Sequence, residues 1–131
     1  FFAVKLNMLD HFKRSLITFI FICKIWDVKP ILMTHMGRVV KNDPIWKLSL
    51  GVADKSFTES QFLDLYKSIN QQMREVATDN MVLLIDLDFI VPKQSDFIYD
   101  IGHLHTEGSR FVGETIAESL TNNYEEFKLI N

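Results

Sequence analysis

The sequence predicts an α/β fold built on a parallel sheet, and two observations lead to this prediction. Segments with the periodicity of amphipathic helices alternate along the chain with short, continuous apolar runs at residues 30–34 and 81–85. Runs of this length and composition are typical of strands that are buried on both faces, as in parallel sheets. The resulting order of helix, strand, helix, strand and helix is that of an α/β domain.

Length and composition indicate one globular domain over residues 1–131 and exclude several classes of function. The chain is 47% hydrophobic and 24% charged, which is ordinary for a globular domain. Its 14 basic and 17 acidic residues give a formal net charge of −3, so there is no strong positive field to attract nucleic acid. Cys23 is the single cysteine, which excludes an intrachain disulfide and a multi-cysteine zinc site.

The first helix is predicted over residues 6–26. Apolar side chains recur every three or four residues at Leu9, Phe12, Leu16, Ile20 and Cys23. After Ser15 the helix is apolar nearly all round, so it is expected to be covered on several sides. The run 15–23 follows Lys13 and Arg14 as the core of a secretory signal would, but it is shorter than the about 20 residues that span a bilayer. Because the helical pattern begins before this run, a buried helix is favoured and no membrane span is predicted.

The middle of the chain is predicted to contain a strand at residues 30–34, a long loop at 35–57 and a second helix. The loop is expected to include a helical turn near Trp46, and long loops in small domains are often functional. The second helix begins with a capping box in which Thr58 precedes Gln61. Its stripe of core-facing side chains is formed by Phe62, Leu65, Tyr66, Ile69, Met73 and Val76.

The remainder of the chain is predicted to form a strand at residues 81–85, an irregular segment at 89–99 and a last major helix. The strand ends at Asp86. Thr106 is the expected N-cap of the last helix, since threonine oxygens accept from free amides at helix starts. Side chains at helical spacing within it are Phe111, Val112, Thr115, Ile116 and Leu120. A further short helix is expected at 124–130.

A candidate catalytic pair is predicted from the polar segments at the strand ends. In open α/β sheets the ligand crevice lies beyond the carboxyl ends of the strands. The polar groups expected there are Thr34 with His35, Asp86 with Asp88, and the loop from Asp100 to His103. Asp100 and His103 are three residues apart in a loop made supple by Gly102, so the carboxylate is expected to bond one imidazole nitrogen. The other nitrogen would then be free to take a proton from a hydroxyl nucleophile.

Two other interpretations of this loop stay open at the level of sequence. Asp100 can simply end a turn, with His103 as an exposed loop residue. His103 and His105 also form an H-x-H pair that could bind a metal together with Asp100 or Glu107. Helix capping at Thr106 accounts for His105 and Glu107 more simply, so no metal site is predicted.

Residues 99–114 resemble the last conserved block of the SGNH (GDSL-type) hydrolases. The sequence there is YDIGHLHTEGSRFVGE, which couples an Asp-x-x-His loop to a helix with a Gly-Ser-Arg-Phe-Val run. Residues 6–34 resemble the family's helix followed by a strand that ends in threonine, and 81–87 resemble its last core strand. The resemblance implies a three-layer α/β/α, flavodoxin-like hydrolase that cleaves carboxylic esters through a serine nucleophile without a metal or organic cofactor. It also implies that Asp100 is the orienting acid and His103 the general base.

The nucleophile and oxyanion motifs of that family do not occur in the sequence. There is no Gly-Asp-Ser block and no Gly-x-Asn-Asp block. Two strands are also too few to cover an all-round apolar helix, so more of the sheet is expected upstream of Phe1. The sequence is therefore interpreted as the C-terminal part of an SGNH-type esterase that is inactive alone and prone to self-association through an exposed sheet edge. The alternative is a non-catalytic α/β interaction module or a degenerate hydrolase relic, with Trp46, Phe57 and loop 35–57 as contact surface.

Overall fold

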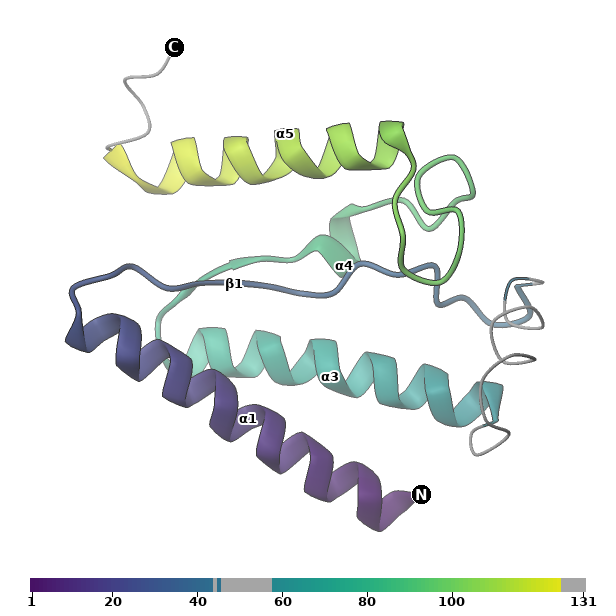
Figure 1. Ribbon diagram of the computed structural model, residues 1–131, viewed down its shortest axis with the longest axis horizontal. Helices are drawn as coiled ribbons and strands as arrows, with labels where there is room; N and C mark the ends of the chain where they lie inside the picture. Colours follow the sequence, from purple (N-terminus) through teal and green to yellow (C-terminus); the bar gives the residue numbers. More distant parts are fainter. Residues whose placement is uncertain (44, 46–57, 126–131) are drawn as a thin grey trace.

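The computed structural model describes residues 1–43, 45 and 58–125. It is a mixed α/β structure in which helices predominate (Figure 1). The elements are α1 (Phe2–Ile25), β1 (Ile31–Met33), α3 (Glu59–Asp79), β2 (Leu83–Ile85), α4 (Leu87–Ile90) and α5 (Thr106–Asn123). The two strands lie between α5 on one side and α1 with α3 on the other (Figure 1).

The two strands are parallel, as predicted. Ile31 pairs with Leu83 and Met33 with Ile85, so both carboxyl ends reach the same edge of the sheet. The described strands have three residues each and are shorter than the apolar runs. At the start of the second run, Met81 has a φ of 54°, and the Val82 amide donates to the Ala77 carbonyl at 2.9 Å. This is the hydrogen bond of a Schellman motif, so the residue predicted to open the strand instead closes α3.

The capping box at the start of α3 is confirmed. The Gln61 amide donates to Thr58 Oγ1 at 3.2 Å, and the Thr58 amide donates to Gln61 Oε1 at 2.9 Å. Farther along α3, Asp64 forms an ion pair with Lys5 of α1, at 2.6 Å. Helix α3 is thus fixed at its start by local bonds and to α1 by packing and charge.

Two groups of buried apolar side chains form the core, one on each side of the sheet. The first joins α1, β1 and α3 and consists of Ile20, Leu32, Val76 and Ala77. The second joins β2, α4 and the loop after α4 and consists of Ile85, Leu87, Val91 and Ile98, with side chains of α5 against it. The core therefore packs α1 and α3 against one side of the two strands and α5 against the other.

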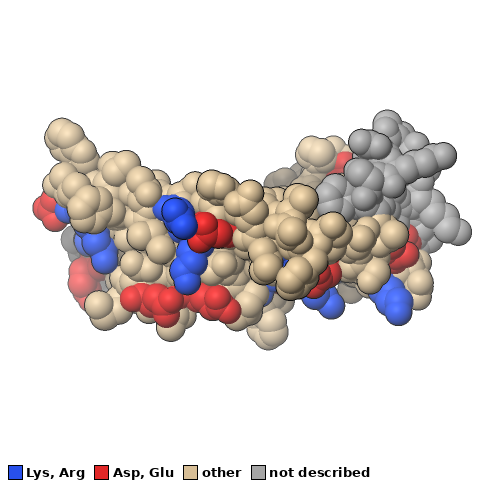
Figure 2. Space-filling model, turned by 90° about the horizontal axis from the view of Figure 1, so that it is seen from below, with Lys and Arg blue, Asp and Glu red and all other residues tan. Residues whose placement is uncertain are grey.

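Helix α1 is covered less than its composition predicts. It begins at Phe2 rather than Leu6, and Ile20 is its one buried residue. Its exposed large apolar side chains include Val4, Leu6, Ile17, Phe19, Phe21 and Ile22. Seen from the side of α1 and α3, much of the surface is uncharged, with acidic and basic groups gathered in a few places (Figure 2). The expected cover on several sides is absent within the described part of the chain, and no described helix could cross a bilayer.

Two further sequence expectations need correction. Helix α4 extends into the segment predicted to be irregular, where the amides of Phe89 and Ile90 donate to the Asp86 carbonyl. The N-cap of α5 is His105 rather than Thr106, and it makes no side-chain cap bond. The helical turn expected near Trp46, and the contact surface expected at Trp46 and Phe57, lie outside the described residues. The same is true of the helix expected at 124–130, beyond its first two residues.

Candidate functional site

Three polar segments meet at the carboxyl edge of the sheet, as predicted, and the first contact joins the two strand ends. Thr34 Oγ1 donates to Asp86 Oδ1 at 2.7 Å, and the Asp88 amide donates back to Thr34 Oγ1 at 2.9 Å. Thr34 is only 1% exposed. The buried hydroxyl of Thr34 thus has both a hydrogen-bond acceptor and a donor. The bonds to Asp86 and Asp88 hold the segment after β2 against the end of β1.

The carboxylates after β2 are neutralised by cations that the sequence analysis did not single out. Arg74 of α3 donates from Nε to Asp86 at 2.7 Å and from its terminal nitrogen to Asp88 at 2.8 Å. Lys93 Nζ reaches Asp88 at 2.6 Å. Arg74 lowers the pKa of Asp86. Burial alone would raise the pKa of Asp88, but Lys93, Arg74 and Tyr66 outweigh it and lower the pKa. Both acids are therefore ionised, and they position the edge rather than exchange protons near neutral pH.

Helix α3 also holds the backbone that leaves β1. Asn70, which is 0% exposed, accepts from the His35 amide at 2.9 Å and donates to the His35 carbonyl at 3.0 Å. Tyr66 Oη lies 2.6 Å from the same carbonyl and 2.8 Å from Asp88 Oδ1. Burial raises the pKa of Tyr66, so the hydroxyl stays protonated and can donate. These contacts fix His35 at the edge of the sheet.

The loop that carries the candidate pair rests against this fixed segment. The Arg38 amide donates to the Ile101 carbonyl at 3.2 Å. A Cβ at Gly37 would lie 2.9 Å from that carbonyl oxygen, so a larger residue there would push the loop away. A Cβ at Gly102 would lie 3.5 Å from Cε1 of His35. The loop from Asp100 to His103 thus lies at the same edge of the sheet as the two strand ends, as predicted.

The loop is closed at its base like a short hairpin. Ile98 and Leu104 form an antiparallel bridge, and the Tyr99 amide donates to the His103 carbonyl at 3.0 Å. Helix α5 starts directly behind this base. Gly108 makes that possible, because a Cβ there would lie 2.2 Å from the Phe97 carbonyl oxygen. The glycine of the Thr-Glu-Gly-Ser run is therefore required by close packing of the helix start on the loop.

Asp100 and His103 are hydrogen-bonded, as predicted from their spacing. His103 Nδ1 lies 2.6 Å from Asp100 Oδ2, while Asp100 Oδ1 accepts from the amides of Gly102 at 2.8 Å and His103 at 2.7 Å. The bond from the Gly102 amide, assisted by the amide and ring of His103, lowers the pKa of Asp100 to about 2. An ionised carboxylate can only accept, so Nδ1 carries the hydrogen and Nε2 has the lone pair of the neutral ring.

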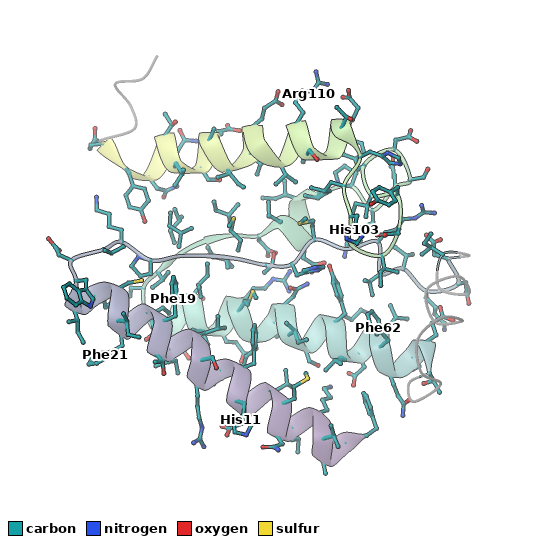
Figure 3. The ribbon with its side chains drawn as sticks, in the orientation of Figure 1. His11, Phe19, Phe21, Phe62, His103 and Arg110 are labelled. Atoms are coloured by element: carbon teal, nitrogen blue, oxygen red, sulfur yellow. The ribbon has the colours of Figure 1, made fainter. Side chains whose placement is uncertain are left out.

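The imidazole of His103 is open to a reactant. Its side chain is 73% exposed, whereas that of Asp100 is 31% exposed. Figure 3 shows His103 in the loop before α5, at the end of the sheet toward which the strands point. Its Nε2 atom, which does not take part in the bond to Asp100, can therefore reach a reactant from solvent.

No hydrogen bond joins a serine hydroxyl to His103 among the described residues, and several serine hydroxyls are bonded locally. Ser15 and Ser68 donate to the carbonyls four residues before them in their own helices. Ser49 and Ser56 lie outside the described residues.

Within residues 1–43, 45 and 58–125, no three acidic, histidine or cysteine side chains are grouped to hold a metal ion. His105 packs its ring against Tyr99, with the ring centroids 5.1 Å apart.

Comparison with known proteins gave no match to a family model, to a curated protein or to a solved structure.

Proposed function

We propose that this chain supplies the Asp–His pair of a Ser-His-Asp triad in an SGNH-type hydrolase of carboxylic esters, and that it is the C-terminal part of that enzyme's domain. The observation that carries the proposal is the 2.6 Å contact between Asp100 and the Nδ1 atom of the exposed His103. Its position at the carboxyl edge of a parallel sheet agrees with the usual location of α/β active sites.

In this proposal His103 is the general base. Nε2 takes the proton of a serine hydroxyl as the oxygen attacks the ester carbonyl, and later returns it to the alcohol that leaves. Asp100 keeps the Nδ1 hydrogen in place and balances the charge of the imidazolium that forms. Water then hydrolyses the acyl-enzyme by the same proton transfers in reverse order. No step calls for a metal or an organic cofactor.

The proposed fold is the three-layer, flavodoxin-like arrangement of this family. Support comes from the parallel strand pair, with α5 on one side and α1 and α3 on the other. Further support comes from α1, whose exposed apolar side chains provide a surface for additional strands and helices. The serine and the oxyanion donors would come from that additional part, since neither motif occurs in the 131 residues.

A non-catalytic interaction module is the second candidate, and one observation favours it. Asp100 Oδ1 accepts from two backbone amides of its own loop, which is sufficient reason for an aspartate at a turn. In that case the contact with His103 would only stiffen the loop. The two candidates differ in whether the complete protein contains a serine nucleophile for His103 to activate.

The discriminating experiment starts from the transcript that encodes this chain. If the proposal holds, the coding sequence upstream of Phe1 contains a Gly-Asp-Ser block and a later Gly-x-Asn-Asp block. The complete product should then hydrolyse short-chain aryl esters, and a fluorophosphonate should label that serine. An initiator methionine directly before Phe1, or a complete product that no fluorophosphonate labels, would favour the interaction module.

A further inference from the structure

We propose that Tyr99 is a positioning residue that sets the plane of the His103 imidazole. The two rings are stacked, with centroids 5.7 Å apart and planes inclined by 18°. Tyr99 follows Ile98 and precedes the acid of the pair, so its ring belongs to the same loop as Asp100 and His103. The inference rests on the proposed function only for what the imidazole does once it is positioned.

The stack is a consequence of the backbone. The Ile98–Leu104 bridge and the bond from the Tyr99 amide to the His103 carbonyl place Tyr99 opposite His103 in an antiparallel pair. Side chains of opposed residues in such a pair project to the same face and pack together. His105 meets the Tyr99 ring at 60° with the centroids 5.1 Å apart, so the tyrosine is packed against two histidines.

The stack restrains a motion that the hydrogen bond limits only in part. The imidazole rotates about its Cβ–Cγ bond, and the single contact between His103 Nδ1 and Asp100 Oδ2 still lets the ring pivot through a range of angles. A second ring lying nearly parallel to it opposes that pivot. For a side chain that is 73% exposed, this restraint is significant because solvent offers little resistance to rotation.

The plane of the ring determines where Nε2 can accept a proton. The Nε2 lone pair lies in that plane, so a ring that pivots spends less time aimed at a hydroxyl group. Stacked aromatic pairs shift such equilibria by about 2- to 12-fold. Loss of the stack should therefore lower kcat by about that factor and leave KM unchanged, because substrate binding does not depend on the orientation of the base.

The first test uses the 131-residue chain, labelled with carbon-13 at histidine Cε1 and diluted until sedimentation shows a folded monomer. It contains four histidines, which are assigned by replacing each in turn with glutamine. The ring protons of His103 should be shifted upfield by the tyrosine ring current in the wild type and in Tyr99→Phe, and not in Tyr99→Leu. His11 on α1 serves as the control resonance. An unchanged His103 resonance in Tyr99→Leu, or no Overhauser contact between the two rings in the wild type, would overturn the inference.

The second test uses the complete hydrolase and separates this inference from the proposed function. Tyr99→Leu should lower kcat with KM unchanged, and Tyr99→Phe should restore wild-type turnover. If His103→Ala has no effect on turnover, the proposed function fails while the positioning seen by resonance stands. If His103→Ala abolishes turnover and the ring resonances do not respond to Tyr99→Leu, the positioning inference fails alone.

Discussion

The carboxylate of Asp100 takes part in three hydrogen bonds within four residues of chain. Oδ1 accepts from two loop amides and Oδ2 accepts from His103, so the acid orders the backbone and orients the imidazole at once. An asparagine could keep the first contacts but would lose the charge that stabilises an imidazolium. The two tasks of Asp100 can therefore be separated by substitution and by pH.

Removal of the imidazole tests its proposed catalytic task. In the complete hydrolase, His103→Ala should reduce ester turnover by about 10⁶-fold, the loss seen when the general base of a triad is removed. Folding should be nearly unaffected, because the side chain is 73% exposed and contributes little to packing. Initial rates on an aryl ester and a thermal melt measure the two effects. His11→Ala on α1 is the matched control, and near-normal turnover in His103→Ala would remove His103 from the mechanism.

The depressed pKa of Asp100 predicts a particular pH dependence of stability. A carboxyl group with a pKa of about 2 in the folded chain and an ordinary value of 3.8 stabilises the fold when ionised. That contribution is complete above the ordinary value and is lost as the pH falls from about 4 to 2. The difference in unfolding free energy between wild type and Asp100→Asn should therefore narrow over that window. Urea unfolding at several pH values measures it, and a difference that is constant with pH would contradict the prediction.

At the scale of elements, the start of α5 depends on one close approach. Gly108 is buried in the first turns of the helix and lies directly over the backbone of Phe97. The same contact holds the base of the loop, where the His105 amide donates to the Phe97 carbonyl at 2.9 Å. The position of the helix and the geometry of the Asp100–His103 loop are thus linked through a single peptide group.

A pair of glycine substitutions in α5 tests this contact. Gly108→Ala places a Cβ 2.2 Å from a backbone oxygen that cannot turn aside, so it should destabilise the chain by about 1–3 kcal/mol. Gly113→Ala adds the same methyl group where nothing lies within 4 Å, and it should stabilise the helix by about 0.5–1 kcal/mol. Urea denaturation of both variants measures the difference. Equal effects of the two substitutions would show that α5 is not held against Phe97.

At the scale of the whole molecule, many of the exposed large apolar side chains of the described residues belong to α1. Phe21 is 63% and Ile22 50% exposed on α1, and a cavity of about 370 Å³ between α1 and α3 is lined mainly by apolar side chains. Figure 3 labels Phe19 and Phe21 on α1, the helix that lies across the sheet from α5. Each large apolar side chain left in water forgoes roughly 1.5–3 kcal/mol of stabilisation, against a typical net stability of about 5–15 kcal/mol.

This exposure predicts that the 131-residue chain self-associates or unfolds easily. Sedimentation over a dilution series should show oligomers that dissociate at low concentration. Phe21→Lys should weaken the association, because it adds charge to the exposed face of α1. Phe89→Lys is the control, since Phe89 is 85% exposed on α4, which packs with the core group on the other side of the sheet. A monomer at high micromolar concentration with a sharp, reversible unfolding transition would contradict the prediction.

Features that depend on neighbouring residues were predictable from the sequence. The capping box of Thr58 and Gln61 and the bond between Asp100 and His103 each follow from a three-residue spacing. The parallel pairing of Ile31 with Leu83 joins distant residues, and the order of helices and strands predicted it instead. The N-cap of α5 and the start of β2 were predicted wrongly. Met81 adopts a left-handed conformation, rare for methionine, because it closes α3. Competition between a helix end and a strand start leaves no clear local signal.

By itself the sequence determined the order of helices and strands and placed an acid and a histidine within bonding distance, because such features arise from contacts between residues near one another in the chain. Only the tertiary structure decided what surrounds them. The ion pair of Arg74 with Asp86 and the bonds of Asn70 to the backbone of His35 depend on how the chain folds back. The close packing at Gly108 likewise depends on a helix meeting a loop. Such contacts depend on the relative placement of whole elements, which burial of the shared core sets and residue spacing does not encode.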